Sequence, residues 1–260
     1  MVPVNTILDF LPAPYINLKV GRCLAIIGTE GALSYISVVA DGTRVKNRLK
    51  ALFRARGIEC NGTGVYSPDE RKDWLAKLDS KAVCARADRQ WQELDLVERL
   101  SEEAEMDLVA EARKHAVTKI LRSVPGIGPI RAAMILGVVG TPHRFRTKKQ
   151  FWGYCGLGVV TATSSEYQLV NGRVCRSKKR PLLRGLNSNY NRAMKAVFKG
   201  AAKTVAAGVW KSRFEAMTAN GTPESLARLT LARKIASITL AVWKKGERYD
   251  HRKLKTMHAA

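Results

Sequence analysis

The most regular pattern of apolar and polar positions lies in the middle of the chain. Between Ala87 and Arg122, apolar residues return at steps of three or four with charged residues between them: Trp91, Leu94, Val97, Leu100, Ala104, Leu108, Ala112 and Ala116. This spacing predicts one long helix over 87–122, and no Gly or Pro interrupts it. A helix of this length needs a partner along its apolar stripe. The pattern leaves open whether that partner comes from the same chain or from a second copy.

Weaker patterns precede this stretch. Residues 1–32 contain three early prolines and no sustained helical or strand period, so we leave them unassigned. We interpret them as a non-native start of the protein. Residues 43–56 interleave Arg and Lys with apolar positions, which predicts a basic amphipathic helix. Ser67 and Pro68 predict a further helix start, with Trp74 and Leu78 on its apolar face.

The second half of the chain predicts a small β element between helices. Residues 158–170 are dense in Val, Thr and Tyr, and Asn171-Gly172 favours a tight hairpin turn into residues 173–175. Helices are predicted over about 182–207 and over 223–245, the second with Thr222 as cap and Pro223 in its first turn. The fold class predicted from these patterns is mainly α with a small β hairpin.

The charge of the chain is divided very unevenly. Residues 1–112 carry 15 basic and 17 acidic side chains, whereas residues 113–260 carry 30 basic and 5 acidic ones. The net charge of +23 therefore comes from the second half. Such an excess indicates a polyanionic partner, most commonly nucleic acid. Ribosomal and membrane-surface proteins can be equally basic, so charge alone does not select among them.

The cysteines and the hydropathy exclude several other classes of protein. Five cysteines are scattered without a Cys-x-x-Cys pair, and four isolated histidines add no zinc spacing, so we expect no metal site and reduced thiols. The apolar run over 23–28 is too short to span a bilayer, and no signal peptide opens the chain. We expect a cytoplasmic protein without a membrane partner.

The clearest local motif for binding is the segment over 124–136, VPGIGPIRAAMIL. Gly126 and Gly128 let the backbone turn tightly between two helices, and amides at the start of the second helix can meet phosphate oxygens. Arg131 follows directly. The segment is similar to the hairpin of helix-hairpin-helix DNA-binding modules, which contact the backbone of DNA rather than its bases. A plain turn between two helices is the alternative interpretation.

Two basic groups support the same interpretation. The first, Arg144, Arg146, Lys148 and Lys149, is interleaved with Phe145, Phe151, Trp152 and Tyr154. The second follows the predicted hairpin and is composed of Arg173, Arg176, Lys178, Lys179, Arg180 and Arg184. Either group could be a solvated face, and the aromatic residues could belong to the core. If about six of these cations meet phosphates of duplex DNA, the log–log salt slope of binding is about −5.

A serine-rich segment over 161–167, TATSSEY, lies between a Gly-rich stretch and the second basic group. A serine beside several arginines could attack a phosphodiester, with the cations stabilising the charged transition state. Taken alone the segment is a weak signal, because such residues are common in β hairpins.

Several of these stretches together resemble the carboxyl-terminal transposase domain of the IS110 family of bacterial insertion sequences. The resemblance covers 121–250 and rests on PGIGPIRAAMIL, GTPHRFRTKKQFWGYCGLGVV, TSSEY, RSKKRPLLRGLN and LARLTLARKIASITLAVWKKGERYD. It implies a transposase whose serine nucleophile, here Ser164, joins covalently to DNA. Ser165 stands where many members have Gly, so the choice between the two serines stays open. The resemblance also implies an element-encoded guide RNA as a partner.

The family further joins this domain to an acidic RNase H-like half that holds Mg²⁺, with a helical coiled-coil segment between. Asp9, Glu30 and Asp41 lack the spacing of its ligands, and no Asp-x-x-Asp pair precedes the helices. We therefore expect the acidic half to be missing and no Mg²⁺ site to be supported in this chain. The expected division is an unassigned start (1–32), a helical remnant with the coiled-coil-like helix (33–120), the transposase domain (121–250) and a basic tail (251–260).

The resulting hypothesis is a DNA-binding transposase, truncated and acting through a serine nucleophile, and a homo-oligomer through the helix over 87–122 is left open. The alternative is a non-catalytic helix-hairpin-helix protein that binds nucleic acid or inhibits an intact transposase. A structural protein that coats nucleic acid is a third interpretation. The carboxylates needed for metal-dependent cleavage are not in the sequence, so the enzymatic activity is left open.

Overall fold

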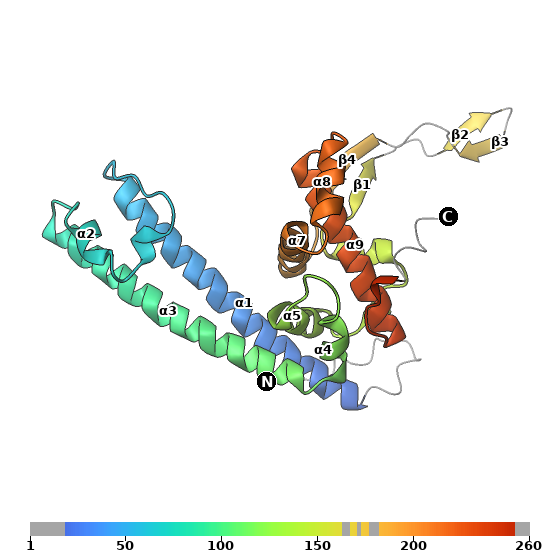
Figure 1. Cartoon of the computed structure of the whole chain (residues 1–260), viewed down its shortest axis with the longest axis horizontal. Helices are drawn as coiled ribbons and strands as arrows, with labels where there is room; N and C mark the ends of the chain where they lie inside the picture. Colours follow the sequence, from blue (N-terminus) through green and yellow to red (C-terminus); the bar gives the residue numbers. More distant parts are fainter. Residues whose placement is uncertain (1–18, 163–166, 171–172, 177–181, 253–260) are drawn as a thin grey trace.

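The computed structural model describes residues 19–162, 167–170, 173–176 and 182–252 (Figure 1). These residues are mainly helical, with short antiparallel strands in the second half, which confirms the predicted fold class. The helices are α1 (Lys19–Arg54), α2 (Arg71–Leu75), α3 (Lys81–Arg113), α4 (Ala116–Leu121), α5 (Pro129–Val139), α6 (Lys148–Tyr154), α7 (Arg192–Ala207), α8 (Lys211–Ala219) and α9 (Glu224–Lys245). Short 3-10 helices are η2 (Gly64–Tyr66) and η3 (Pro142–Arg144). None of the helices in these ranges is long and apolar enough to cross a bilayer.

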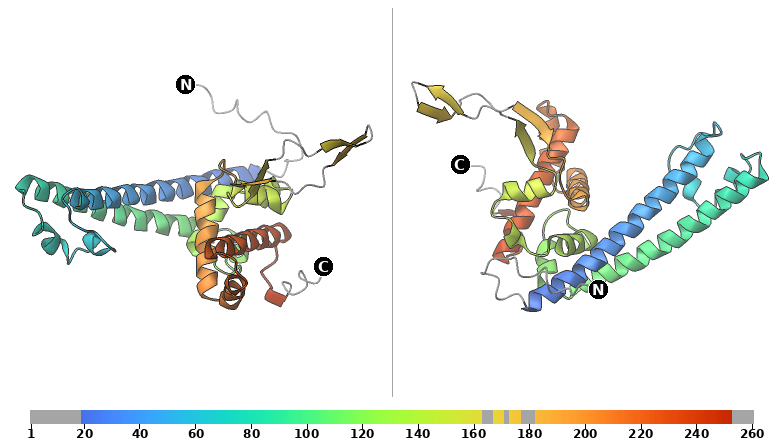
Figure 2. Two further views of the ribbon diagram at one scale, coloured as in Figure 1. Left: turned by 90° about the horizontal axis from the view of Figure 1, so that it is seen from above. Right: turned by 180° about the vertical axis from the view of Figure 1, so that it is seen from behind.

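The first two long helices form a hairpin that projects from the rest of the molecule. α1 and α3 run side by side in every view, joined at the far end by η2 and α2, while the later helices gather around its base (Figures 1 and 2). Leu94 of α3 and Leu49 of α1 are fully buried near the far end, and the indole Nε1 of Trp91 donates to the Val65 carbonyl at 2.8 Å. The apolar stripe predicted for the long helix therefore has a partner in its own chain. A second copy as an additional partner stays a prediction.

Several predicted helix boundaries are wrong. α1 begins at Lys19, although no helix was expected before residue 33. The early prolines all precede Lys19, and Ala32 inside the helix is fully buried. The long helix ends at Arg113 instead of Arg122, because His115 takes an extended conformation and caps a separate helix, α4. The Thr118 hydroxyl donates to the Ala112 carbonyl across this break.

The other two differences lie at helix starts. The helix predicted from 182 begins only at Arg192, where the side chain of Asn191 accepts a hydrogen bond from the Met194 amide and caps it. The helix predicted from Ser67 begins at Arg71. The last predicted helix begins at Glu224, one residue after the predicted start, and ends at Lys245 as predicted. α8 was not predicted.

The buried side chains form two separate cores. One fills the far end of the α1–α3 hairpin and includes Phe53, Trp74 and Trp91. The other fills the base and joins α5, α7 and α9 to the nearer ends of α1 and α3, through Ala32 and Leu108. This second core extends across residue 120, so the buried contacts do not decide the predicted division there, which stays a prediction.

The strands make two antiparallel ladders. β1 (Val159–Ala162) pairs with β4 (Leu182–Leu186), and β2 (Tyr167–Val170) pairs with β3 (Arg173–Arg176). In the second ladder Val170 pairs with Arg173, which confirms the predicted hairpin; its turn, Asn171-Gly172, lies outside the described residues. β2 and β3 lie beyond β1 and β4, away from the helices (Figure 1).

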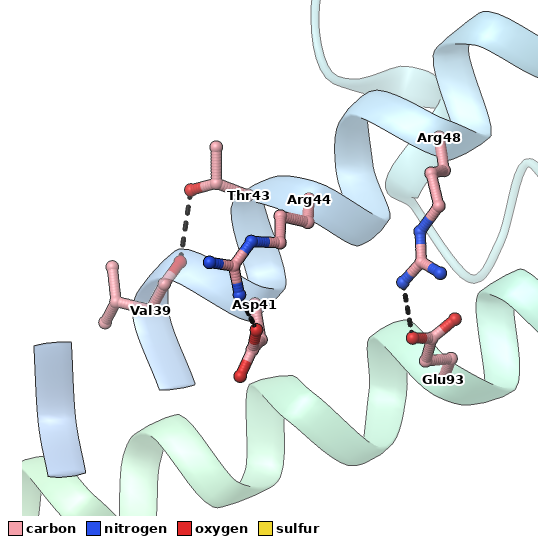
Figure 3. A network of polar contacts seen from close by, with 6 residues as sticks. All are labelled: Val39, Asp41, Thr43, Arg44, Arg48 and Glu93. Atoms are coloured by element: carbon pink, nitrogen blue, oxygen red, sulfur yellow. Dashed lines mark hydrogen bonds and ion pairs between the residues drawn. The ribbon is translucent and has the colours of Figure 1, made fainter. Parts of the chain in front are cut away.

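Ion pairs connect the two helices of the hairpin along its polar flanks. Arg48 of α1 donates to Glu93 of α3 at 2.5 Å, one helical turn and a half from the Arg44–Asp41 pair within α1 (Figure 3). Arg71 donates from both terminal nitrogens to Asp95 of α3, at 2.5 and 2.8 Å. These contacts fix the connecting segment onto α3 and pair some of the basic side chains of the first half with acidic ones.

Replacing Asp95 by Asn should remove an acid-sensitive contribution to stability. The hydrogen bond from Arg71 holds the pKa of Asp95 below its ordinary value of 3.8. A lowered pKa in the folded state stabilises the fold above that ordinary value, and the contribution is lost as the pH falls through the folded value. Because Asp95 is half exposed, we expect less than about 1 kcal/mol. Urea unfolding between pH 7 and pH 3 measures it.

Asp69→Asn is the matched control, since Asp69 is exposed and takes part in no ion pair among the described residues. The free energy of unfolding of Asp95→Asn should fall less steeply than that of the parent below pH 4. A parent and an Asn variant with the same pH dependence would contradict the assigned role of Arg71.

Candidate nucleic-acid interface

The predicted Gly motif forms the turn between α4 and α5, and its first glycine packs against α7. Gly126 has φ +80°, a left-handed conformation that favours glycine. A Cβ at this position would lie 2.8 Å from the Ala201 carbonyl oxygen and 2.9 Å from Cγ1 of Val205. Val124 and Ile127 on either side are buried. The first glycine of the motif therefore allows two segments of backbone to approach each other inside the protein.

The second glycine lies in different surroundings. Gly128 is the residue before α5, with φ −82° and ψ −177°, and a Cβ there would meet nothing within 4 Å. The first amides of α5 have no partner within the helix, and its dipole favours an anion at this end. Pro129 lacks an amide hydrogen, so only the residues after it can donate. Of the two glycines, Gly128 is the one that leaves room for a phosphate.

Arg131 links the turn to α7. Its guanidinium Nη1 donates to the Gly126 carbonyl at 2.8 Å and to the Thr204 hydroxyl at 3.2 Å, and the group lies over Gly200. All these partners are neutral, so they leave the positive charge of Arg131 uncompensated beside the turn. The structure thus gives Arg131 a positioning role, and its contact with DNA stays a prediction.

The first predicted basic group is divided between core and surface. Phe145 and Phe151 are buried, with ring centroids 4.9 Å apart, so these aromatic residues belong to the core. Arg144 donates to the Val139 carbonyl at 3.0 Å and lies over the ring of Tyr154. Arg146, Lys148 and Lys149 are exposed.

The second predicted basic group belongs to the two ladders. Arg173 is exposed at the start of β3, while Arg176 and Arg184 lie within β3 and β4. Lys178, Lys179 and Arg180 lie outside the described residues, as do Ser164 and Ser165. The described neighbours Ala162 and Leu182 are paired, and so are Tyr167 and Arg176. The serine segment and the lysine segment therefore both join the same two ladders.

Motif analysis missed the basic residues of α8 and α9. Arg213, Arg233 and Lys234 lie around one groove with Lys148 of α6. The available signal was the helical spacing of Thr230, Lys234 and Ser237, which puts these three positions on one face of α9. The second half has 30 basic residues for 5 acidic ones, so most of its cations cannot be paired with a carboxylate.

The described ranges contain no group of three or more His, Cys, Asp or Glu side chains that could hold a metal ion. The donor set required for the Mg²⁺ that the resemblance implies is therefore not assembled there. The buried thiol of Cys155 has its pKa raised by burial, which makes it a poor ligand and a poor nucleophile.

Comparisons with known proteins find similarity to transposases in the second half of the chain. Residues 118–216, which run from α4 to α8, match the model of the transposase IS116/IS110/IS902 family. A protein of Streptomyces coelicolor, described as the insertion element IS110 uncharacterized 43.6 kDa protein, is 29% identical over 150 residues. That alignment covers 58% of this chain and 34% of the relative, so the chain spans about a third of the length of the curated relative it matches. Residues 118–216 of the chain thus match the transposase domain of the IS116/IS110/IS902 family.

Proposed function

We propose that this chain binds DNA and acts in the transposition of an insertion sequence. One observation carries the proposal: the transposase domain at 118–216 lies in the half of the chain with 30 basic and 5 acidic residues. A domain of this family with so large an excess of cations is suited to hold the phosphates of DNA. The charges of the first half nearly balance, and some are paired as in Arg48–Glu93 and Lys46–Glu98, so the positive charge belongs to the second half.

The proposed reaction is a transesterification at Ser164. The hydroxyl oxygen of Ser164 forms a bond to a phosphorus atom of DNA, the bond from that phosphorus to one deoxyribose oxygen breaks, and the hydroxyl proton ends on the departing oxygen. A strand hydroxyl can then attack the same phosphorus, release the serine and regain a phosphodiester without an external energy source. Arg173, Arg176, Lys178, Lys179, Arg180 and Arg184 are the cations proposed to stabilise the charged transition state. This step uses only the serine and basic side chains of the chain.

The turn at 124–128 is proposed to act as a helix-hairpin-helix contact with the DNA backbone. Gly128 and the start of α5 supply room and amides, while Gly126 and Arg131 hold the turn on α7. This division of roles is supported by the closeness of Gly126 to the Ala201 carbonyl oxygen. The contact fixes the position of the DNA and carries no sequence information.

Two further partners are proposed. A second copy could pack on the exposed flank of the hairpin, where Leu96, Leu100 and Met106 of α3 are exposed. A guide RNA is proposed because the family resemblance implies one and the charge of the second half suits it.

Binding to the ends of the element tests the proposed function. The full chain is titrated into fluorescent duplexes that carry the DNA flanking its own coding region, with scrambled duplexes of equal length and composition as control, between 50 and 200 mM salt. We expect a log–log salt slope of about −5 from about six phosphate contacts, and an affinity for the flanking DNA about tenfold above the scrambled control.

The outcomes separate the alternatives. Binding with the expected salt slope and no preference for the flanking DNA would favour a protein that coats nucleic acid. Preference without any strand transfer would favour the non-catalytic binding protein or the inhibitor of an intact transposase. No salt-dependent binding to any duplex would overturn the proposal as a whole.

A further inference from the structure

A groove of about 520 Å³ lies between α6, α8 and α9. Its cations come from each of these helices and from the turn before α6: Arg146, Lys148, Arg213, Arg233, Lys234 and Lys244. Its remaining lining side chains are apolar, hydroxyl-bearing or, in Trp152, aromatic, and none is a carboxylate. We call it the α9 groove. A concave site lined by cations of one sign concentrates positive potential and favours an anion.

The walls of the α9 groove are fixed by hydrogen bonds to neutral groups. Arg233 Nε donates to the Leu157 carbonyl at 2.7 Å, and Lys244 Nζ donates to the Phe145 carbonyl at 2.5 Å. The indole Nε1 of Trp152 donates to the Arg233 carbonyl at 3.0 Å and to the Ser237 hydroxyl at 3.1 Å. These bonds hold the side chains of Arg233 and Lys244 in place on neutral acceptors, so the groove is arranged before any ligand binds.

The electrostatics of the groove point the same way. Burial lowers the pKa of Lys234, and the nearby charges of Arg213 and Lys148 lower it further. Burial also lowers the pKa of Arg233. Cations from three helices thus repel one another across a partly desolvated space, and a bound anion would relieve that repulsion.

We propose that the α9 groove holds the sugar-phosphate backbone of a single nucleic-acid strand, an inference that rests on the proposed function. The lining residues of α9 extend from Thr230 to Lys244, a rise of about 21 Å along the helix. This length extends over several successive phosphates of a strand. Trp152 adds an aromatic side chain to the positive groove, the combination that single-strand sites use for stacking bases.

A single strand fits this groove better than a duplex or an acidic protein. The groove takes its cations from α6, α8 and α9, so they can surround one backbone, whereas a duplex separates its two backbones by grooves of about 6 to 12 Å.

The test removes two lysines of the groove, of which Lys148 also lies over the ring of Trp152. Lys148→Gln and Lys234→Gln are combined, because neither lysine forms an ion pair among the described residues. Lys72→Gln with Lys81→Gln is the matched control, since both lysines are exposed on the hairpin and the change in net charge is the same. Full-length proteins are titrated by fluorescence anisotropy with labelled single-stranded DNA, single-stranded RNA and duplex DNA. Circular dichroism and urea unfolding confirm that each variant is folded.

Two lost phosphate contacts should lower the salt slope for a single strand by about 1.4 and weaken binding about 25-fold at 0.1 M salt. The control pair should change binding less than about twofold. The titrations with DNA and with RNA show which kind of strand the groove prefers. Competition by inorganic phosphate and by polyphosphate shows whether the groove binds phosphate without a nucleic acid. We expect polyphosphate to compete only at much higher concentration than the strand.

Several results would overturn the inference. An unchanged salt slope in the groove variant, with normal binding by the parent, rejects the groove and leaves the proposed function standing. An equal loss of binding affinity in the control variant would show that the weaker binding follows from the lower net charge and not from the groove. A larger loss for duplex than for single strand, or tight capture of polyphosphate alone, rejects the single-strand occupant. Failure of the parent to bind any nucleic acid rejects the proposed function itself.

Discussion

Ser164→Ala should abolish the covalent protein–DNA adduct while leaving binding to DNA within about twofold of the parent. The reason is chemical: the methyl group of alanine has no oxygen to form the bond to phosphorus, and no charge is altered. Full-length protein is incubated with Mg²⁺, RNA transcribed from the flanking element and DNA carrying the element's ends. A denaturing gel then reports detergent-resistant adduct, and a native gel reports binding.

Ser165→Ala is the matched control, since it removes the neighbouring hydroxyl from the same segment. Adduct formed by the Ser165 variant and missing from the Ser164 variant assigns the nucleophile. The reverse pattern moves the nucleophile to Ser165. Adduct formed by both single variants contradicts the proposed reaction. The absence of adduct from the parent and both variants contradicts it too, and normal gel shifts would then identify a chain that only binds DNA.

The sequence predicted best those elements whose signals are local. The stripe through Trp91 and Leu94 predicted most of α3, since helical spacing along one face depends only on the order of residues. Asn171-Gly172 predicted the β2–β3 hairpin because this pair of residue types favours a tight reversal wherever it stands between strands. The start of α9 was predicted within one residue from its proline and first acidic side chain.

Elements that depend on distant partners were missed. Residues 182–186 look helical in isolation, yet as β4 they pair with β1, twenty or more positions earlier in the chain. The start of α1 at Lys19 was missed because its first residues show no sustained period, although Ala32 and Leu108 from distant positions join one core. The α9 groove was invisible for the same reason, since its cations come from α6, α8 and α9. The spacing of residue types along the sequence does not reveal contacts between distant segments.

The Gly motif shows the same limit within a single site. Sequence alone assigned Gly126, Gly128 and Arg131 the same role, contact with DNA, because all three follow the pattern of a binding hairpin. In the fold, Gly126 and Arg131 face α7, and only Gly128 has open space beside it. Which glycine packs and which leaves room depends on where α7 lies, and that is a property of the tertiary structure.

Gly126→Ala should lower the free energy of unfolding by about 2–4 kcal/mol, whereas Gly128→Ala should leave it within about 1 kcal/mol. At Gly126 the left-handed φ of +80° strains any residue with a Cβ. The added methyl group would also press on the Ala201 carbonyl oxygen, 2.8 Å away, and force the turn off α7. At Gly128 the backbone is in a region that alanine adopts freely, and nothing lies within 4 Å of the new methyl group.

Urea unfolding of the two variants measures the difference, and DNA titration separates stability from binding. If Gly128 and the start of α5 approach a phosphate, Gly128→Ala should weaken DNA binding several-fold in a protein of parental stability, because the methyl group occupies the space for the phosphate. Equal stability losses in both variants would contradict the packing of the turn on α7. If a stable Gly128→Ala variant bound DNA with the affinity of the parent, α5 would have no role in DNA contact. DNA binding would then depend on the cations of the second half alone.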